Sequence, residues 1–243
     1  FNRFRIKKQN ELLKIELEET AKRNAIELQK NQADLTALKS QMNPHFIFNA
    51  LNSIQELYTI GDKKTANEQM GNFASLTRKI LDVSGKQKID LADEIDILTK
   101  YLELEGIRFE NDFVYQINLS KNIDVDYVQL PPMLIQPYVE NSIKHGLLHK
   151  KGTKHLTLNF ILNDDETNLV CEIIDNGIGR IASSEINKNR PQSHVSFSTS
   201  ATEKRLQLLN QGKQENIAVL FDDIEDENNN ALGTKVSIQI PIN

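Results

Sequence analysis

Three groups of residues in this sequence have the types and the spacing that chemistry requires. The first is His45, which directly follows Pro44 in the stretch QMNPHFIFNALNSI at residues 41–54. A proline lacks an amide hydrogen and clashes with the preceding turn, so it should bend or open the helix that this stretch otherwise predicts. The bend would expose the imidazole, which in its neutral form is a good nucleophile near neutral pH. A histidine in the core of a helical bundle is the alternative, but such a core needs no proline beside it.

The second group lies in QPYVENSIKHG, residues 136–146. Glu140, Asn141, Lys144 and His145 fall within about a turn and a half of a predicted helix, and the last three share one face. Asn141 offers an oxygen suited to Mg²⁺, Glu140 offers a carboxylate, and the other two are suited to phosphate. Taken singly, each of these residues is equally consistent with a solvated polar face that ends at Gly146.

The third group is DNGIG, residues 175–179, at the end of an apolar stretch that predicts a strand. Such a strand places the Asp175 carboxylate at the edge of a sheet, and the glycines allow the backbone to approach a ligand closely. The carboxylate can accept a hydrogen bond from an exocyclic amine. An ordinary turn is the alternative for these residues when they are taken alone.

Hydrophobic periodicity predicts the elements that position these groups. A broken heptad in the first 60 residues predicts a parallel dimeric coiled coil running into the His45 segment, and a dimer of helical hairpins would make a four-helix bundle. Further helices are expected at residues 63–83, 91–109, 131–148 and 201–211, and strands at 113–120, 155–162, 168–175, 216–223 and 233–242. The polar stretch at 179–200 is expected to be a long mobile loop. Asp93 and Glu94 suit the N-terminus of the third helix.

Composition excludes several classes of protein. The 243 residues carry a net charge of −5, which argues against direct binding of nucleic acid. The single Cys171 excludes an internal disulfide, has no zinc-ligand spacing with the histidines, and is expected to be buried in a strand. No apolar run is long enough to span a membrane. The chain begins with Phe1 rather than methionine, and its basic and aromatic opening FNRFRIKK is typical of the cytoplasmic end of a membrane-spanning helix. A frayed, solvated terminus is the alternative for these residues.

Together, the motifs resemble the sensor histidine kinases of the LytS/YehU type from about Leu38 to the end of the chain. LKSQMNPHFIFNALNSI is similar to the family's phosphoacceptor segment, LPPMLIQPYVENSIKHGL to its ATP-site helix, DNGIG to its adenine-binding loop, and DLADEIDILTKYLELEGIRF to its connecting helix. The resemblance implies an α+β fold in three parts. These are a membrane-proximal coiled coil at residues 1–40, a dimerisation and phosphotransfer hairpin at 41–88, and a GHKL (Bergerat) α/β sandwich that binds ATP at 89–243.

The resemblance also implies roles for individual residues. His45 would accept the γ-phosphoryl group of ATP, and Asn49, one turn on, would orient the ring or a water, since Phe46 stands where many other histidine kinases carry an acidic residue. Asn141 would hold Mg²⁺ with Glu140 beside it. The remaining residues implied at the nucleotide are Lys144 and His145 near the phosphates, Asp175 at the adenine amine, and Gly177 and Gly179 around it.

The expected phosphate loop departs from the family pattern. The family carries glycines before its last long helix, whereas residues 194–210 contain none, and Ser198 stands in a glycine's place. Amides at a helix N-terminus near Thr202 are expected to meet phosphate. Arg205 matches the family's arginine and is expected to support the lid, and Gly233 and Thr234 match the family's last strand.

The function implied is ATP-dependent autophosphorylation of His45 and transfer to an aspartate of a response regulator, by analogy one with a LytTR-type domain. The expected setting is a homodimer at the cytoplasmic face of the inner membrane, joined to an upstream transmembrane sensor region of the same chain. A catalytically weak dimeric scaffold with a decayed nucleotide site is the alternative, and the missing glycines support it. A GHKL ATPase without phosphotransfer is a third reading, against which the NPHF segment argues.

Overall fold

The structure, a computed structural model of the chain, describes Glu19 and residues 44–109, 112–163, 165–188, 195–212, 215–228 and 230–242. The chain divides into two compact units, residues 1–51 and 52–243. Of the predicted coiled-coil segment, only Glu19 is described, and it is helical. The coiled coil, its dimer and the domain boundaries at residues 41 and 89 stay predictions. Among the residues described, no helix combines the length and the apolar content that crossing a membrane requires.

The His45 segment lies at the start of helix α2, Pro44–Thr59. Proline is well suited to the first position of a helix, because its missing amide hydrogen would have no partner there and its fixed φ matches the helix. His45 is the second residue of α2. The bend predicted before Pro44 falls outside the described residues.

Helix α3, Lys63–Ser84, follows a short turn in which Gly61 has a φ of 90°. Its N-cap Asp62 accepts a hydrogen bond from the Thr65 amide at 3.1 Å. Helix α4, Leu91–Gly106, comes next and ends in the 3₁₀ turn η1, Ile107–Phe109. Lys79 of α3 pairs with Asp93 of α4 at 2.8 Å. These helices confirm the ones predicted at residues 63–83 and 91–109.

A five-stranded mixed sheet follows, in the order β2-β4-β5-β7-β6. Strands β2 and β4 pair in parallel, and the other pairs are antiparallel. The bounds are β2 Phe113–Leu119, β4 Lys154–Leu162, β5 Asn168–Asp175, β6 Ala218–Glu225 and β7 Ala231–Pro241. A separate short ladder joins β1, Ile89–Asp90, to β3, Gln129–Leu130. Sequence reasoning found the five long strands and missed this pair, which is too short to show an alternating pattern.

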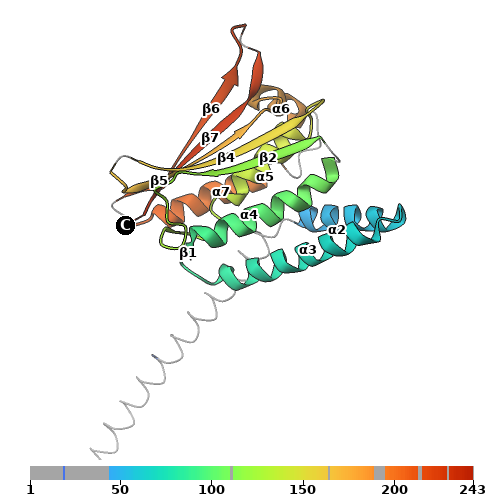
Figure 1. Cartoon of the computed structure of the whole chain (residues 1–243). Coiled ribbons are helices and arrows are strands. Elements are labelled where there is room, and N and C mark those ends of the chain that lie inside the picture. The colour runs from blue at the N-terminus through green and yellow to red at the C-terminus, as the bar shows by residue number, and fades with distance from the viewer. Residues whose placement is uncertain are drawn as a thin grey trace, which may run out of the picture. The chain divides into compact units, whose positions relative to one another are not determined.

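The core lies between this sheet and the helices on one of its faces. Figure 1 shows α4, α5 (Gln136–Asn141) and α7 (Val195–Asn210) on the same side of the sheet. Alternate residues of β5 are buried, as expected for a strand with one covered face, and Cys171 is among them. Buried partners include Leu98 and Leu102 of α4, Leu158 and Phe160 of β4, Ile173 of β5, and Ile238 and Ile240 of β7. The predicted α+β class, with helices followed by a mixed sheet that is covered by helices on one face, is confirmed.

The helix predicted at residues 131–148 begins later than expected. Helix α5 covers Gln136–Asn141 and continues as the π-helical turn η2, Ser142–Leu147. Residues 131–135 instead form a turn in which Met133 has a φ of 54°, a left-handed value that ends regular helix. Glu94 of α4 holds this turn, because its carboxylate accepts hydrogen bonds from the amides of Met133 at 2.7 Å and Ile135 at 3.1 Å. Glu94 therefore lies near a helix N-terminus as predicted, but its partners belong to a distant turn.

The loop predicted at residues 179–200 is wrong at 180–188 and at 195–200, and its part at 189–194 lies outside the described residues. Helix α6 covers Arg180–Lys188, and α7 covers Val195–Asn210. Within α6 the apolar Ile181 is exposed and the polar Ser183 is buried. A helix that covers a polar site buries small polar residues, so its hydrophobic periodicity is weak and the sequence pattern does not reveal it.

Glu94 predicts a pH-dependent stability. Burial raises the pKa of its carboxyl group from 4.5 to about 7, against the lowering effects of the Met133 and Ile135 amides and of Arg205. The folded protein therefore binds this proton more tightly than the unfolded chain does. The stabilisation is complete below the unfolded pKa of 4.5 and is lost as the pH rises through about 7. The difference in pKa corresponds to about 3 kcal/mol.

Urea unfolding of the wild type and of Glu94→Gln, from about pH 4.5 to about pH 8, measures this contribution. The wild-type free energy of unfolding minus that of the variant is expected to fall by about 3 kcal/mol over this range. Burial also raises the pKa of Glu105 and Asp175, and these contributions cancel in the difference. A difference that does not change with pH would contradict the prediction.

Candidate active site

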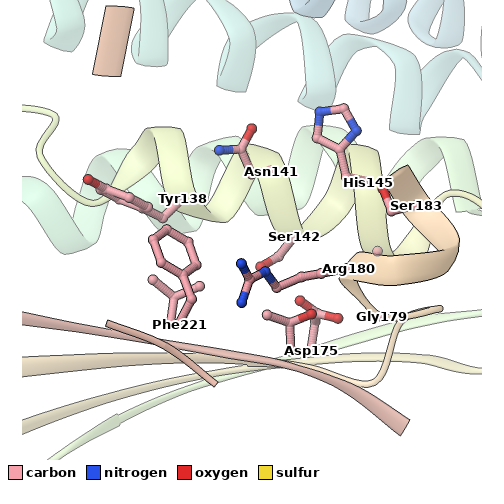
Figure 2. Close-up of a pocket in the computed structure, with 12 residues that line it drawn as sticks. Tyr138, Asn141, Ser142, His145, Asp175, Gly179, Arg180, Ser183 and Phe221 are labelled. Atoms are coloured by element: carbon pink, nitrogen blue, oxygen red, sulfur yellow. The ribbon is translucent and has the colours of Figure 1, made fainter. Parts of the chain in front are cut away.

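A cavity of about 120 Å³ opens between the α5–η2 helix and the end of the sheet. Figure 2 shows side chains from the helix on one side of it and from the sheet and the start of α6 on the other. Its lining residues are Tyr138, Asn141, Ser142, His145, Gly146, Asp175, Gly179, Arg180, Ser183, Phe221, Thr234 and Val236. The second and third groups of residues that the sequence singled out therefore meet at one place.

Asp175 is the last residue of β5 and the acid of this cavity. It is 2% exposed, and its side chain extends from the sheet toward the helix (Figure 2). The Gly177 amide donates a hydrogen bond to its Oδ1 at 2.9 Å. Burial raises the pKa of the carboxyl group, while the hydrogen bonds from the Gly177 amide, the Ser142 hydroxyl and the Thr234 amide lower it. The site therefore holds a fixed, nearly dry carboxylate whose hydrogen-bonding geometry is set before any ligand arrives.

Glycines pack around the side chain and backbone of Asp175, because no side chain fits there. A Cβ at Gly146 would lie 2.8 Å from Oδ1 of Asp175, and one at Gly177 would lie 2.5 Å from the Gly146 backbone. Gly233 has a φ of 154°, and a Cβ there would lie 1.9 Å from the Asp175 carbonyl oxygen. The sequence identified Gly177 and Gly233 by resemblance but interpreted Gly146 only as the end of a helix. Its close contact with Asp175 could not be predicted from local sequence.

The helix above the cavity changes geometry at its middle. The Leu148 amide bonds to the Ile143 carbonyl at 2.8 Å, five residues back, which is the hydrogen bond of a π-helix. Such wide turns are rare and occur frequently at functional sites. Figure 2 shows Ser142 extending toward Asp175, whereas Asn141 and His145 extend from the other side of the helix. One helix thus presents a hydroxyl to the buried acid and an amide and an imidazole to the region beyond it.

Arg180 and Phe221 close one side of the cavity. The Arg180 guanidinium lies 5.4 Å from the centre of the Phe221 ring and 3.6 Å from Oδ2 of Asp223. The Tyr138 ring lies 6.2 Å from the same phenylalanine. Sequence reasoning missed these residues. Arg180 directly follows DNGIG, which is the available signal for it, whereas Phe221 comes from a strand far along the chain and carries none.

Comparison with known proteins finds a family match in the part of the chain that precedes the cavity-lining residues in sequence. Residues 33–113 match the family described as histidine kinase, and this range includes His45, α3 and α4. The Sensor protein LytS of Oceanobacillus iheyensis is 33% identical over 151 residues, which are 61% of this chain and 24% of that protein. The region matched is similar to sensor histidine kinases of the LytS type. The Sensor histidine kinase BtsS of Escherichia coli is also 33% identical, over 60% of this chain and 25% of its own length.

The chain spans about a quarter of the length of these curated relatives. Among solved structures, the histidine kinase domain of a blue-light activated histidine kinase from Erythrobacter litoralis covers 86% of this chain and 94% of its own. Its identity is 14% and its TM-score 0.44.

The structure brings together only some of the residues predicted for the site. Asn141, His145, Asp175, Gly179 and Thr234 line the cavity. Gly177 and Gly233 pack directly against Asp175. Glu140 and Lys144 are not among the lining residues. Glu140 accepts a hydrogen bond from the Gln136 side chain at 3.2 Å and interacts electrostatically with Tyr101 of α4.

Arg205, Ser198 and Thr202 lie on α7. The Arg205 guanidinium donates hydrogen bonds to the Met133 carbonyl at 3.1 Å and to the Pro132 carbonyl, so it is not directed into the cavity. Thr202 lies inside α7 rather than at its start, so the predicted helix N-terminus near this residue is wrong. The Ser198 side chain lies outside the part of the chain that the structure describes. His45 and Asn49 belong to the other unit, whose placement relative to the cavity is not described.

Proposed function

We propose that this chain is the kinase region of a sensor that binds ATP in the cavity, phosphorylates its own His45, and transfers the phosphoryl group to an aspartate of a response regulator. The observation that supports this most directly is the buried Asp175, which is ringed by Gly146, Gly177 and Gly233 and faces a cavity. A carboxylate kept dry and open to one side is suited to a flat ligand that donates a hydrogen bond.

Adenine fits this chemistry. Its exocyclic amine would donate to Asp175, and its faces would pack against the apolar and aromatic walls formed by Tyr138, Phe221 and Val236. Because Asp175 and the surrounding backbone are already hydrogen-bonded to one another, little reorganisation is needed on binding. Gly179 and Thr234 would shape the remaining wall, as the resemblance implies.

The phosphates would extend toward the part of the helix that carries Asn141, Lys144 and His145. Asn141 and His145 point away from Asp175 in Figure 2, and these directions support a phosphate end distinct from the adenine end. Mg²⁺ would be held by the Asn141 oxygen with Glu140 beside it, and it would neutralise the phosphate charge. Within the described ranges, no cluster of three or more His, Cys, Asp or Glu residues is arranged to hold a metal. Mg²⁺ commonly takes one or two protein ligands and completes its shell with phosphates and water.

His45 would act as the nucleophile. The lone pair of a ring nitrogen forms the N–P bond while the bond from the γ-phosphorus to its bridging oxygen breaks and ADP leaves. Asn49, one turn along α2, would orient the ring. Ser198 and Arg205 would act from α7, the first near the phosphates and the second by supporting the site from outside the cavity.

The wider setting belongs to the same proposal. The relatives are named sensor proteins, and this chain spans only about a quarter of them. We infer a homodimer, an upstream transmembrane sensor region of the same chain, a position at the cytoplasmic face of the inner membrane, and a response regulator of the LytTR type. The net charge of −5 disfavours direct contact with nucleic acid.

Incubation with γ-labelled ATP and Mg²⁺ tests the proposal. The chain is expected to acquire label that is labile in acid and stable in alkali, as a phosphoramidate bond is. His45→Gln should remove the label and leave nucleotide binding unchanged. Asn141→Ala should remove both the label and the Mg²⁺-dependent part of nucleotide binding.

His155→Gln, a change at an exposed histidine of β4, serves as the matched control and should keep the label. A wild-type chain that binds no nucleotide would favour the scaffold, and one that hydrolyses ATP without becoming labelled would favour the ATPase. Either result would overturn the proposal.

A further inference from the structure

The turn at residues 131–135, before the α5 helix, is hydrogen-bonded to side chains from two different helices. On one side is Glu94 of α4 and on the other is Arg205 of α7. We propose that Glu94 and Arg205 are positioning residues that fix this turn, and with it the helix carrying Asn141 and His145, relative to α7. The inference rests on the proposed function, since it assigns these two residues a role in forming the ATP site.

Glu94 holds the turn through its amides. The side chain is 0% exposed, and its two oxygens accept separately from the Met133 amide at 2.7 Å and the Ile135 amide at 3.1 Å. A carboxylate has the two acceptor atoms that this arrangement requires, whereas a glutamine side chain has one acceptor and one donor group. The bonds are buried, so water does not replace them when they are lost.

Arg205 holds the same turn through its carbonyls. Its guanidinium donates to the carbonyl oxygens of Pro132 and Met133, so Met133 is bonded through its amide to α4 and through its carbonyl to α7. Arg205 also interacts electrostatically with Glu94, which lowers the pKa of that carboxyl group. The planar fork of an arginine can serve two carbonyls at once, and a lysine has no equivalent geometry.

Met133, which both helices bind, has a backbone conformation that is unfavourable by itself. Met133 has a φ of 54°, which side chains other than glycine adopt rarely and at a cost. Such conformations persist where the surrounding contacts determine them, and here the contacts come from two helices far apart in sequence. The turn is therefore held by its partners rather than by local preference.

The position of the turn sets the position of the site. Helix α5 begins at Gln136, directly after Ile135, and reaches Tyr138 and Asn141 within two turns. Because α5 is short and continues into the wide η2 turn, its direction depends on how its first residues are anchored. Misplacement of a binding group by about 1 Å is enough to lower activity about a hundredfold. Glu94 and Arg205 thus act on the cavity although neither lines it.

Three variants of the whole chain test this: Glu94→Gln, Arg205→Lys and the double variant. Amide hydrogen exchange at Met133 and Ile135 and the dissociation constant for ATP are measured in each. Each single variant is expected to speed exchange of these amides about fivefold and to weaken ATP binding about fivefold. The double variant should raise the dissociation constant for ATP by less than the product of the two single-variant fold-changes, because both changes release the same turn.

Glu105→Gln is the matched control, since Glu105 is also a buried acid of α4 but bonds to Arg108 at 2.5 Å rather than to the turn. It should leave both readouts within about twofold of the wild type. Single variants that keep wild-type exchange and wild-type ATP affinity, or effects that multiply independently, would overturn the inference. If the wild type binds no ATP, the proposed function fails, and the assigned role of Glu94 and Arg205 in forming an ATP site fails with it. If the wild type binds ATP, and Glu94→Gln and Arg205→Lys match it in amide exchange and in ATP affinity, then the positioning role fails and the proposed function stands.

Discussion

Asp175→Asn is expected to weaken ATP binding about a hundredfold while the protein stays folded. The carboxylate can only accept hydrogen bonds, and the exocyclic amine of adenine can only donate them toward it. Asparagine would present to the amine either its carbonyl oxygen, a weaker acceptor, or its own NH2 group, a second donor. A buried site in which two donors face each other rejects its ligand strongly. Isothermal titration with ATP, with and without Mg²⁺, measures the loss.

The fold should tolerate this change. Burial raises the pKa of Asp175, which means that its charge is held at a cost, and removing that charge offsets the weaker hydrogen bonds from Gly177 and Ser142. The free energy of unfolding is expected to change by no more than about 1 kcal/mol. Asp223→Asn is the control, because Asp223 pairs with Arg180 beside the cavity without lining it. Wild-type affinity in Asp175→Asn would show that this acid does not bind the base.

Gly233→Ala is expected to lower the free energy of unfolding by about 3 kcal/mol or more. The new Cβ would lie 1.9 Å from the Asp175 carbonyl oxygen, at the end of the β5–β7 ladder, where Asp175 pairs with Thr234. Backbone on both sides must shift, so the overlap cannot be relieved by turning a side chain. ATP binding should fail as well, because the displaced backbone carries Asp175.

Gly212→Ala separates collision from backbone strain. Gly212 also has a positive φ, 75°, but a Cβ there would meet no atom within 4 Å. Its cost is expected to be about 1 kcal/mol, the penalty of a left-handed alanine alone. Urea unfolding of both variants gives the comparison, and equal losses would show that the close contact between β5 and β7 contributes nothing.

The sheet and the long helices could be predicted because their patterns are local. The alternation in NLVCEIID shows which residues face the core, and the predicted strand at 168–175 is β5 residue for residue. The resemblance added the pairing of the QPYVENSIKHG helix with DNGIG, which no local pattern contains. The structure brings these two segments together around one cavity.

The parts that escaped prediction depend on tertiary contacts. Glu94 has the features of an ordinary helix N-terminal acid, and only the fold shows that its partners are the amides of Met133 and Ile135. Helix α6 has an exposed Ile181 and a buried Ser183, because it covers a polar site. Its hydrophobic pattern is therefore the reverse of that of an ordinary surface helix. Arg205 could be located from the sequence, but its bonds to two carbonyls of a distant turn could not.

The π-helical turn at Ser142–Leu147 has a consequence for how such sequences are compared. A wide turn accommodates one residue more than a regular α-helical turn. The side-chain positions after it are therefore rotated about the helix axis by about 100° relative to those before it. A homologue that lacks one residue there would restore the regular helix and rotate Gly146 away from Asp175 unless the downstream chain compensated. When two aligned sequences differ by a single residue in this segment, the gap therefore belongs between Asn141 and Gly146, and these two residues must be matched independently.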